Sequence, residues 1–252
     1  ARDIARLLTA GFSSIAGGLQ QLLLEPTRNR VSVTLPASFA ENWFTPAISE
    51  FYRRHAEIDL RLDASNRDVD LLAEDFDFAI RYGQPVADPL EEILLFGDQV
   101  FPVCSPEFAA RHDLNPQSRT LRGVPLIHVL NRTSDPGWAG FHGWARAFGF
   151  DARGLEQGVR YSRISSGLQS AILGLGLVIC GLTEAFNAIK AGKLALPFGP
   201  SMRLKTHYQY RLIWVKHQKI TPLQEDFRTW LLQRAAAFVA ESSDLLPDPV
   251  LL

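Results

Sequence analysis

The stretch VSVTLPASFAENWFTPAISEFYRRH, residues 31–55, decides how the chain folds. Its first five residues alternate between apolar and polar side chains, as a strand with one buried face does, and Pro36 follows them. The residues from Phe39 to Arg54 have the apolar spacing of a helix. A strand that turns directly into a helix opens a βαβ unit, so this stretch predicts an α/β fold.

The same alternation continues along the chain. Further strands are predicted at 58–62, 76–80, 126–129, 158–161, 175–180 and 208–215, and helices at 39–54, 68–74, 138–148, 162–173, 183–191 and from the N-cap residue Thr221 onward. Strands that alternate with helices imply parallel pairing. The long apolar run 92–103 changes character at Gly97-Asp98, as a strand that leaves one sheet region and joins another would. We therefore expect two α/β lobes.

Composition excludes several function classes. The chain has 252 residues, of which 46% are apolar, enough for one large domain or two small lobes. Its formal net charge is −1 with the two signs interspersed, so we expect this chain to be a poor non-specific binder of DNA. No run of eighteen apolar residues predicts a membrane span. Cys104 and Cys180 each lie in an apolar run, which favours buried thiols in a reducing, cytoplasmic compartment.

Residues 1–30 are predicted to form one helix followed by a short polar linker. Apolar residues repeat at heptad positions, with Ala5, Phe12 and Leu19 at a and Leu8, Ile15 and Leu22 at d. This pattern is typical either of a seam between two subunits or of an amphipathic helix packed on its own domain. Because the chain does not begin with Met, we expect it to be part of a longer protein.

Signatures of catalysis are absent from the sequence. It contains no G-x-S-x-G elbow, no P-loop and no H-E-x-x-H helix, and its six histidines are scattered. We therefore predict no catalytic residue, no metal site, no cofactor and no enzymatic activity.

Polar side chains stand instead at the ends of two predicted strands, just before helices. Ser38 follows the first strand, and Ser162, Ser165 and Ser166 follow the strand at 158–161. Ligands of open α/β sheets bind beyond the carboxyl ends of the strands, where free helix N–H groups attract anions. Each serine is also a suitable helix N-cap. Two such ends, one in each lobe, favour a ligand between the lobes.

The residues from Ser38 to Gly83 resemble the effector domain of LysR-type transcriptional regulators, most closely the subgroup of the glycine-cleavage activator and the β-lactamase regulator. The resemblance extends over about residues 31–240. It is carried by the order and spacing of Trp43 and Pro46, Phe51 and His55, Val69-Asp70, Asp77-x-Ala79-Ile80-Arg81-Tyr82-Gly83, Phe101-Pro102-Val103-Cys104-Ser105-Pro106, Trp138 with Trp144, and Gly174-x-Gly176.

This resemblance implies a periplasmic-binding-protein-like fold, in which two α/β lobes are joined by two crossover strands and preceded by a linker helix. The expected divisions are a linker and dimerisation helix at 1–30, lobe I at 31–97 and 208–252, and lobe II at 98–207. The winged helix-turn-helix that reads DNA in this family would lie N-terminal to the helix and is missing from this sequence.

The resemblance also implies a function. We expect a cytoplasmic ligand-sensing and oligomerisation domain, a homodimer or homotetramer with no membrane partner. A small effector, anionic or amino-acid- or peptide-like, would bind between the lobes and alter promoter binding or transcription activation through the missing domain. The alternatives are a solute-binding protein of a transport system, which would need a secretory signal, and an enzyme on a two-lobed scaffold.

Family effector contacts map onto individual positions. Ser38 matches the hydroxyl residue of the loop that holds the effector, Asp70 an acidic contact, and Tyr210 a pocket tyrosine. In lobe II, Arg163 and Ile164 stand where relatives often carry Asp and Ser, so the nearby serines compete for the role. Arg163 would make the pocket more cationic and favour a carboxylate or phosphate. The predicted effector contacts are Ser38, Phe39, Asp70, Tyr82, Gly83, Ser162, Ser165, Ser166 and Tyr210.

Overall fold

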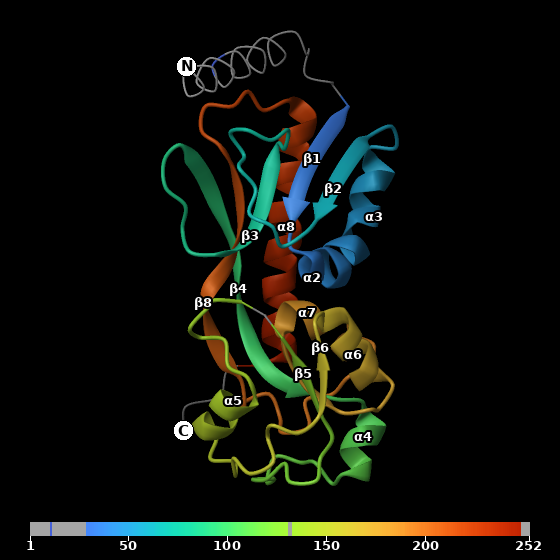
Figure 1. Cartoon of the computed structure of the whole chain (residues 1–252). Coiled ribbons are helices and arrows are strands. Elements are labelled where there is room, and N and C mark those ends of the chain that lie inside the picture. The colour runs from blue at the N-terminus through green and yellow to red at the C-terminus, as the bar shows by residue number, and fades with distance from the viewer. Residues whose placement is uncertain (1–10, 12–28, 131–132, 248–252) are drawn as a thin grey trace, which may run out of the picture.

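The computed structural model describes residue 11 and residues 29–130 and 133–247, and Figure 1 shows how its elements are arranged. The predicted linker helix and its heptad seam lie outside this part of the chain, except that Arg30 already belongs to the first strand.

The opening stretch forms a strand and a continuous helical segment, as predicted. Strand β1 (Arg30–Leu35) is buried on both faces, because its apolar side chains and the polar Ser32 and Thr34 are all at most 1% exposed after Arg30, and the next residue, Pro36, is extended and ends it. The helical segment begins two residues earlier than expected, with α2 (Ala37–Phe39). It continues through a π-helical turn, η1 (Ala40–Phe44), into α3 (Thr45–Arg54). The end of β1 is therefore held directly against a helix N-terminus.

One eight-stranded sheet carries the fold, with the strand order β2-β1-β3-β8-β4-β7-β5-β6. β1 is parallel to β2 and β3, and β5 is parallel to β6 and β7, which confirms the predicted parallel pairing. The remaining strands are β2 (Asp59–Ala64), β3 (Phe78–Gly83), β4 (Leu90–Val103), β5 (Leu126–Val129), β6 (Val159–Tyr161), β7 (Leu177–Gly181) and β8 (Leu204–Val215). The remaining helices are α4 (Pro106–Arg111), α5 (Phe141–Ala147), α6 (Ile164–Ile172), α7 (Leu182–Lys190) and α8 (Pro222–Leu245).

Strands β4 and β8 cross from one half of the sheet to the other. They pair with each other in antiparallel fashion from Leu90↔Val215 to Val100↔Leu204. The far end of β8 pairs with β3, whereas residues 100–103 of β4 pair with β7. The register shifts between Gly97 and Gln99, the place where the sequence changes character. We name the half with β1, β2 and β3 lobe I and the half with β5, β6 and β7 lobe II; their predicted residue boundaries stay a prediction.

The prediction of a helix at 68–74 is wrong, because this segment forms a single turn. The Asp70 carboxylate accepts a hydrogen bond from Leu72 N at 2.9 Å, and the Asp70 carbonyl accepts from Ala73 N at 3.1 Å and Glu74 N at 2.9 Å. A short acidic side chain that bonds to its own backbone competes with helix propagation. The turn therefore ends after one cycle.

Helix α8 supplies a large part of the lobe I core. Its predicted buried side chains, Phe227, Trp230, Leu231 and Phe238, are all at most 5% exposed. Phe44 packs edge-on against Trp230, with ring centroids 5.7 Å apart. In Figure 1 the helix runs along the strands of lobe I, so it holds the opening βα unit in place.

The N-cap of α8 offers a test of how much the start of this helix contributes to stability. Thr221 Oγ1 accepts from Gln224 N at 3.3 Å, and Gln224 Oε1 accepts from Thr221 N at 2.9 Å. We expect Thr221→Ala to lower the free energy of unfolding by about 1 kcal/mol, because the Gln224 N–H loses its side-chain acceptor. Urea unfolding measures the change. The exposed Thr45, whose side chain makes no capping hydrogen bond, supplies the control Thr45→Ala, and an equal loss in both variants would contradict this account.

Candidate functional site

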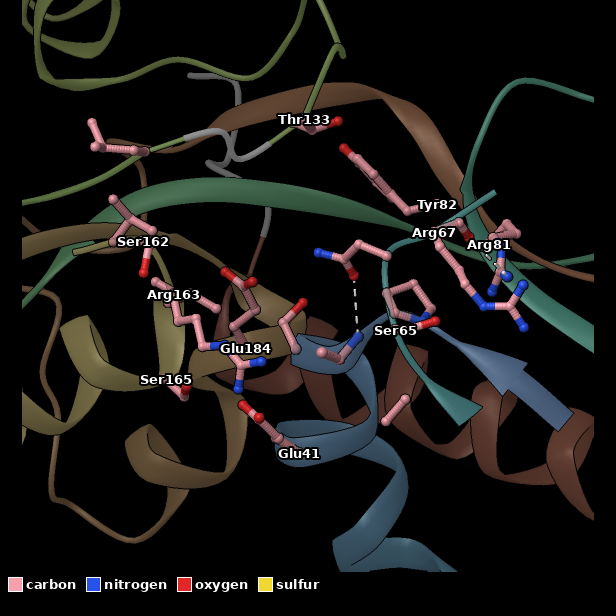
Figure 2. Close-up of a pocket in the computed structure, with 18 of the residues that line it drawn as sticks. Glu41, Ser65, Arg67, Arg81, Tyr82, Thr133, Ser162, Arg163, Ser165 and Glu184 are labelled. Carbon is pink, nitrogen blue, oxygen red and sulfur yellow. Dashed lines mark hydrogen bonds between the residues drawn. The ribbon is translucent and has the colours of Figure 1, made fainter. Parts of the chain in front are cut away.

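A cavity of about 620 Å³ lies between the two lobes. Most of its lining residues lie at or just beyond the carboxyl ends of β1, β2, β3, β5, β6 and β7, the location expected for a ligand of an open α/β sheet. Figure 2 shows the side chains of both lobes facing one another across it. The lining residues are Pro36, Ala37, Ser38, Glu41, Ala64, Ser65, Asn66, Arg67, Asp68, Arg81, Tyr82, Val129, Leu130, Thr133, Trp138, Ser162, Arg163, Ile164, Ser165, Glu184 and Tyr210.

Two helices begin at this cavity without a side-chain cap. The N-cap residues of α2 and α6 are Pro36 and Arg163, and neither side chain accepts a bond from the helix backbone. By contrast, α4 and α8 are capped by Ser105 and Thr221. At α2, Ala37 N donates to Asn66 Oδ1 at 3.2 Å, and the following N–H groups are left to water or to a ligand. Both lobes therefore present free donors to the same space.

Ser38 does not cap its helix, which excludes one of the two roles expected for this serine. The cap position belongs to Pro36, and Ser38 lies within the first turn, where its carbonyl accepts from Asn42 Nδ2 at 2.9 Å. Within the described part of the chain, the Ser38 hydroxyl makes no hydrogen bond. A half-buried hydroxyl without a partner at the wall of a cavity is available to a ligand.

Three guanidinium groups line the cavity, and they differ in how they are paired. Arg67 forms ion pairs with Asp63 at 3.3 Å and with Glu74 at 2.7 Å. The half-buried Arg81 donates to Thr34 Oγ1 at 2.8 Å, and burial lowers the pKa of its guanidinium. The Arg163 side chain makes neither an ion pair nor a hydrogen bond with any residue that the structure describes. Arg163 is therefore the cation most available to a bound anion.

Acidic side chains line the same cavity. Glu184 is buried, and its Oε2 accepts from Gly181 N at 3.0 Å at the start of α7. Behind it lies Asp98, whose Oδ1 accepts from Gln99 N at 2.8 Å and Thr183 N at 3.2 Å. Asp98 Oδ2 has no partner, and burial together with repulsion from Glu184 raises the pKa of Asp98 to about 7. Glu41 and Asp68 are exposed. The cavity thus offers partners for both signs of charge.

Five of the nine predicted contacts line the cavity: Ser38, Tyr82, Ser162, Ser165 and Tyr210. The other four lie elsewhere. Phe39 is fully buried, and its ring lies 4.8 Å from the rings of both Trp43 and Tyr210. Gly83 pairs with Gln209 in the sheet, and the Asp70 side chain closes its own turn. Ser166 is exposed on α6. The roles of all nine in effector binding remain predictions.

Several lining residues were not among the predicted contacts. Glu184 follows β7, Arg67 and Asp68 follow β2, and Thr133 and Trp138 follow β5. Glu184, like Ser38, lies in the first turn of a helix that directly follows a strand, so the same local pattern could have indicated it. Thr133 and Trp138 are different, because only the fold of their loop brings them to the cavity.

Neither a metal cluster nor a membrane span is found in the described part of the chain. No group of three or more His, Cys, Asp or Glu residues there lies close enough to hold a metal ion. No helix there is both long and apolar enough to cross a bilayer.

Asp98 makes stability depend on pH. The pKa of Asp98 is raised from 3.8 to about 7 in the folded state. Between pH 3.8 and about pH 7, Asp98 is therefore protonated in the folded state and ionised in the unfolded state. The free energy of unfolding therefore falls as pH rises through this window, by at most about 1.4 kcal/mol per pH unit, and the penalty persists above it. In Asp98→Asn the amide keeps an acceptor oxygen and places an N–H beside the unpartnered Thr183 hydroxyl. We expect the variant to gain stability relative to the wild type as pH rises from 5 to 8.

Urea unfolding at pH 5, 6, 7 and 8 measures this difference. Asp88→Asn is the matched control, because Asp88 is exposed and pairs with Lys216. A difference between Asp98→Asn and the wild type that does not change with pH would refute the raised pKa.

The sequence matches the family model described as the LysR substrate binding domain over residues 25–236. It is 31% identical over 226 residues to the HTH-type transcriptional regulator PerR of Escherichia coli strain K12, covering 88% of this chain and 71% of that protein. It is 29% identical over 228 residues to the glycine cleavage system transcriptional activator of the same strain, covering 90% and 72%. The fold is similar to that of the effector domain of the transcriptional regulator AmpR of Pseudomonas aeruginosa, with a TM-score of 0.62, 26% identity, and coverage of 85% of this chain and 98% of that domain.

These findings confirm the predicted family and the predicted two-lobed fold. The relatives are transcriptional regulators, which favours a ligand-sensing regulator over a transport protein and over an enzyme. The chain belongs to the LysR substrate-binding domain family and is the ligand-sensing domain of a LysR-type transcriptional regulator.

Proposed function

We propose that the cavity between the lobes is the effector site of this regulator, and that its effector is a small anionic or amino-acid- or peptide-like molecule. In the whole regulator, a cytoplasmic protein, occupancy would alter promoter binding or transcription activation through a winged helix-turn-helix. The observation that carries the proposal is the pair of uncapped helix N-termini, at α2 and α6, that open onto one cavity from opposite lobes.

The anionic part of the effector follows from these helix ends. Free N–H groups and the positive end of each helix dipole favour negative charge. The Ser38 hydroxyl adds a donor from lobe I, and Arg163 adds a full positive charge from lobe II. A carboxylate bound between them would satisfy donors of both lobes at once.

The acidic lining favours a second, cationic group on the effector. Glu184, Glu41 and Asp68 face the same cavity, and a purely anionic molecule would meet their repulsion. An α-amino acid or a short peptide carries an ammonium group close to its carboxylate and matches both signs. Because such a ligand contacts both lobes, it binds one arrangement of the lobes more tightly than others and shifts their equilibrium.

A thermal-shift panel tests the effector class. It contains amino acids, dipeptides, the corresponding carboxylates without an amino group and the corresponding amines. We expect zwitterions to raise the melting temperature most. For the compound with the largest shift, we expect Ser38→Ala and Tyr210→Phe each to weaken binding about fivefold, as the loss of one hydrogen bond of about 1 kcal/mol does.

Ser49→Ala is the control, because Ser49 is exposed on α3 and does not line the cavity. Unchanged affinity in both cavity variants, measured by calorimetry, would remove these residues from the site. A larger shift with simple amines than with zwitterions would overturn the proposed charge complementarity.

Assembly into a homodimer or homotetramer is the second part of the proposal. In an antiparallel dimer, helix 39–54 of one subunit would pair with helix 166–173 of the other. Leu173 is 66% exposed and Leu175 61% exposed at the end of α6, and Tyr52 on α3 is 41% exposed. Exposed apolar side chains on both predicted partners support such a contact.

Sedimentation velocity at micromolar concentration tests the assembly. We expect the wild type to sediment as a dimer or tetramer, and Leu173→Asp to dissociate it, because a charge in an apolar interface lacks a partner. Leu94 is 48% exposed on β4, outside the predicted interface, and Leu94→Asp is the control. A wild type that sediments only as a monomer would count against the proposal.

A further inference from the structure

Asp135 is a buried carboxylate in the loop after β5, and four donors surround its side chain. Tyr82 Oη donates to Oδ2 at 2.6 Å, and Tyr208 N donates to the same oxygen at 2.8 Å. Gly137 N donates to Oδ1 at 2.7 Å, and His207 N lies 3.1 Å from Oδ2 and 3.2 Å from Oδ1. Asp135 is only 4% exposed and is not one of the residues that line the cavity.

The backbone of Asp135 is also bonded, and its partners do line the cavity. Asp135 N donates to Thr133 Oγ1 at 3.2 Å, and Asp135 O accepts from Trp138 N at 3.0 Å. Three lining residues, Tyr82, Thr133 and Trp138, therefore share one residue as a hydrogen-bond partner. Figure 2 shows Tyr82 pointing from lobe I toward Thr133 of lobe II.

The donors come from three parts of the fold. Tyr82 lies on β3 of lobe I, Gly137 lies in the lobe II loop, and His207 and Tyr208 lie on β8 where that strand crosses between lobes. The Tyr82 ring lies 5.8 Å from that of Tyr208 and 6.3 Å from that of Trp138, so the side chains also pack together. This carboxylate joins both lobes and the crossover strand.

Two features show that the arrangement is specific. A Cβ atom on Gly137 would lie 2.9 Å from His207 N and 3.2 Å from Asp135 Oδ1, so only glycine lets the loop approach β8 this closely. Burial opposes ionisation of Asp135, but the bonds from Tyr82, Tyr208, Gly137 and His207 outweigh it and hold its pKa below the usual value. At neutral pH Asp135 therefore only accepts hydrogen bonds, and the Tyr82 proton is committed to it.

We propose that Asp135 is a positioning residue of the effector cleft, which fixes the side chains of Tyr82, Thr133 and Trp138 against the crossover strand β8 without itself touching the effector. The relevance to effector binding rests on the proposed function of the cavity. The positioning itself is a property of the protein without effector, so it is tested without one.

The first measurement follows Trp138 by acrylamide quenching of tryptophan fluorescence. The other four tryptophans, Trp43, Trp144, Trp214 and Trp230, are at most 7% exposed, so acrylamide reaches mainly Trp138. In Asp135→Asn the side chain keeps its shape, but its amide N–H group must face N–H or O–H donors. We expect a quenching constant that is about twofold or more above the wild type, because the loop leaves β8.

The second measurement is amide hydrogen exchange. We expect exchange in residues 133–138 and 207–208 to accelerate about tenfold in Asp135→Asn, which corresponds to about 1.4 kcal/mol of local stability. Exchange in α8 should stay as in the wild type. A merely structural role would instead accelerate exchange in all elements together.

Tyr82→Phe separates the positioning role from local loop stability. It removes one hydroxyl on β3, which bonds to neither Gly137 N nor Tyr208 N, yet we expect exchange at both amides to accelerate. In the double variant with Asp135→Asn the effects should be smaller than the sum of the single ones, because both act on the same bond. Should Asp135→Asn fail to fold, Tyr82→Phe alone decides.

Asp151→Asn is the matched control, because Asp151 also closes a turn in lobe II, with Arg153 N at 3.1 Å, and does not line the cavity. Wild-type quenching and wild-type exchange in Tyr82→Phe would overturn the proposal, as would strictly additive effects in the double variant. These results do not depend on the thermal-shift panel, so each proposal fails separately.

Discussion

The antiparallel pairing of β4 with β8 is the contact on which the rest of the structure depends. These strands alone, among the elements described, join the two halves of the sheet, because β8 also pairs with β3 of lobe I and β4 also pairs with β7 of lobe II. Their lobe I half is reinforced by the largely buried ion pair of Arg211 with Glu92 and by a hydrogen bond from Trp214 Nε1 to Glu91 at 3.1 Å. A shift of β4 along β8 would separate Arg211 from Glu92 and leave a buried charge without a partner. The ion pair therefore favours one register of the two strands.

This pairing also explains why the cavity is polar. It sets two groups of parallel strands with their carboxyl ends toward a common space, and each strand passes into a loop or helix there. Helices α4 and α8, which begin away from the cavity, each satisfy one N–H group of the first turn with a serine or threonine side chain. Helices α2 and α6 begin at the cavity and do not, so their donors are kept for a ligand or water.

Two buried carboxylates near the crossover show how surroundings set a charge. Asp98 has two N–H donors and a second carboxylate, Glu184, nearby, so burial and repulsion raise its pKa. Asp135 is about as deeply buried, but four donors converge on it, and its pKa falls. Burial and a neighbouring carboxylate therefore let Asp98 titrate near neutral pH, whereas the converging donors keep Asp135 ionised.

Local patterns in the sequence were sufficient for the elements and for one wall of the cavity. Alternating apolar residues identified β1, helical spacing identified the segment after Pro36, and Thr221 marked the start of α8, because each signal depends on neighbours within a few residues. Ser38 was found for the same reason. The turn at Asp70 was missed because a side-chain bond to the backbone outweighed helical spacing.

The wall formed by Tyr82, Thr133 and Trp138 depends on Asp135. Its donors Tyr82 and Tyr208 lie 53 and 73 residues away, and no local pattern encodes contacts between such distant residues. Folding brings them together, and the physical cause is the approach of the lobe II loop to the crossover strand at Gly137.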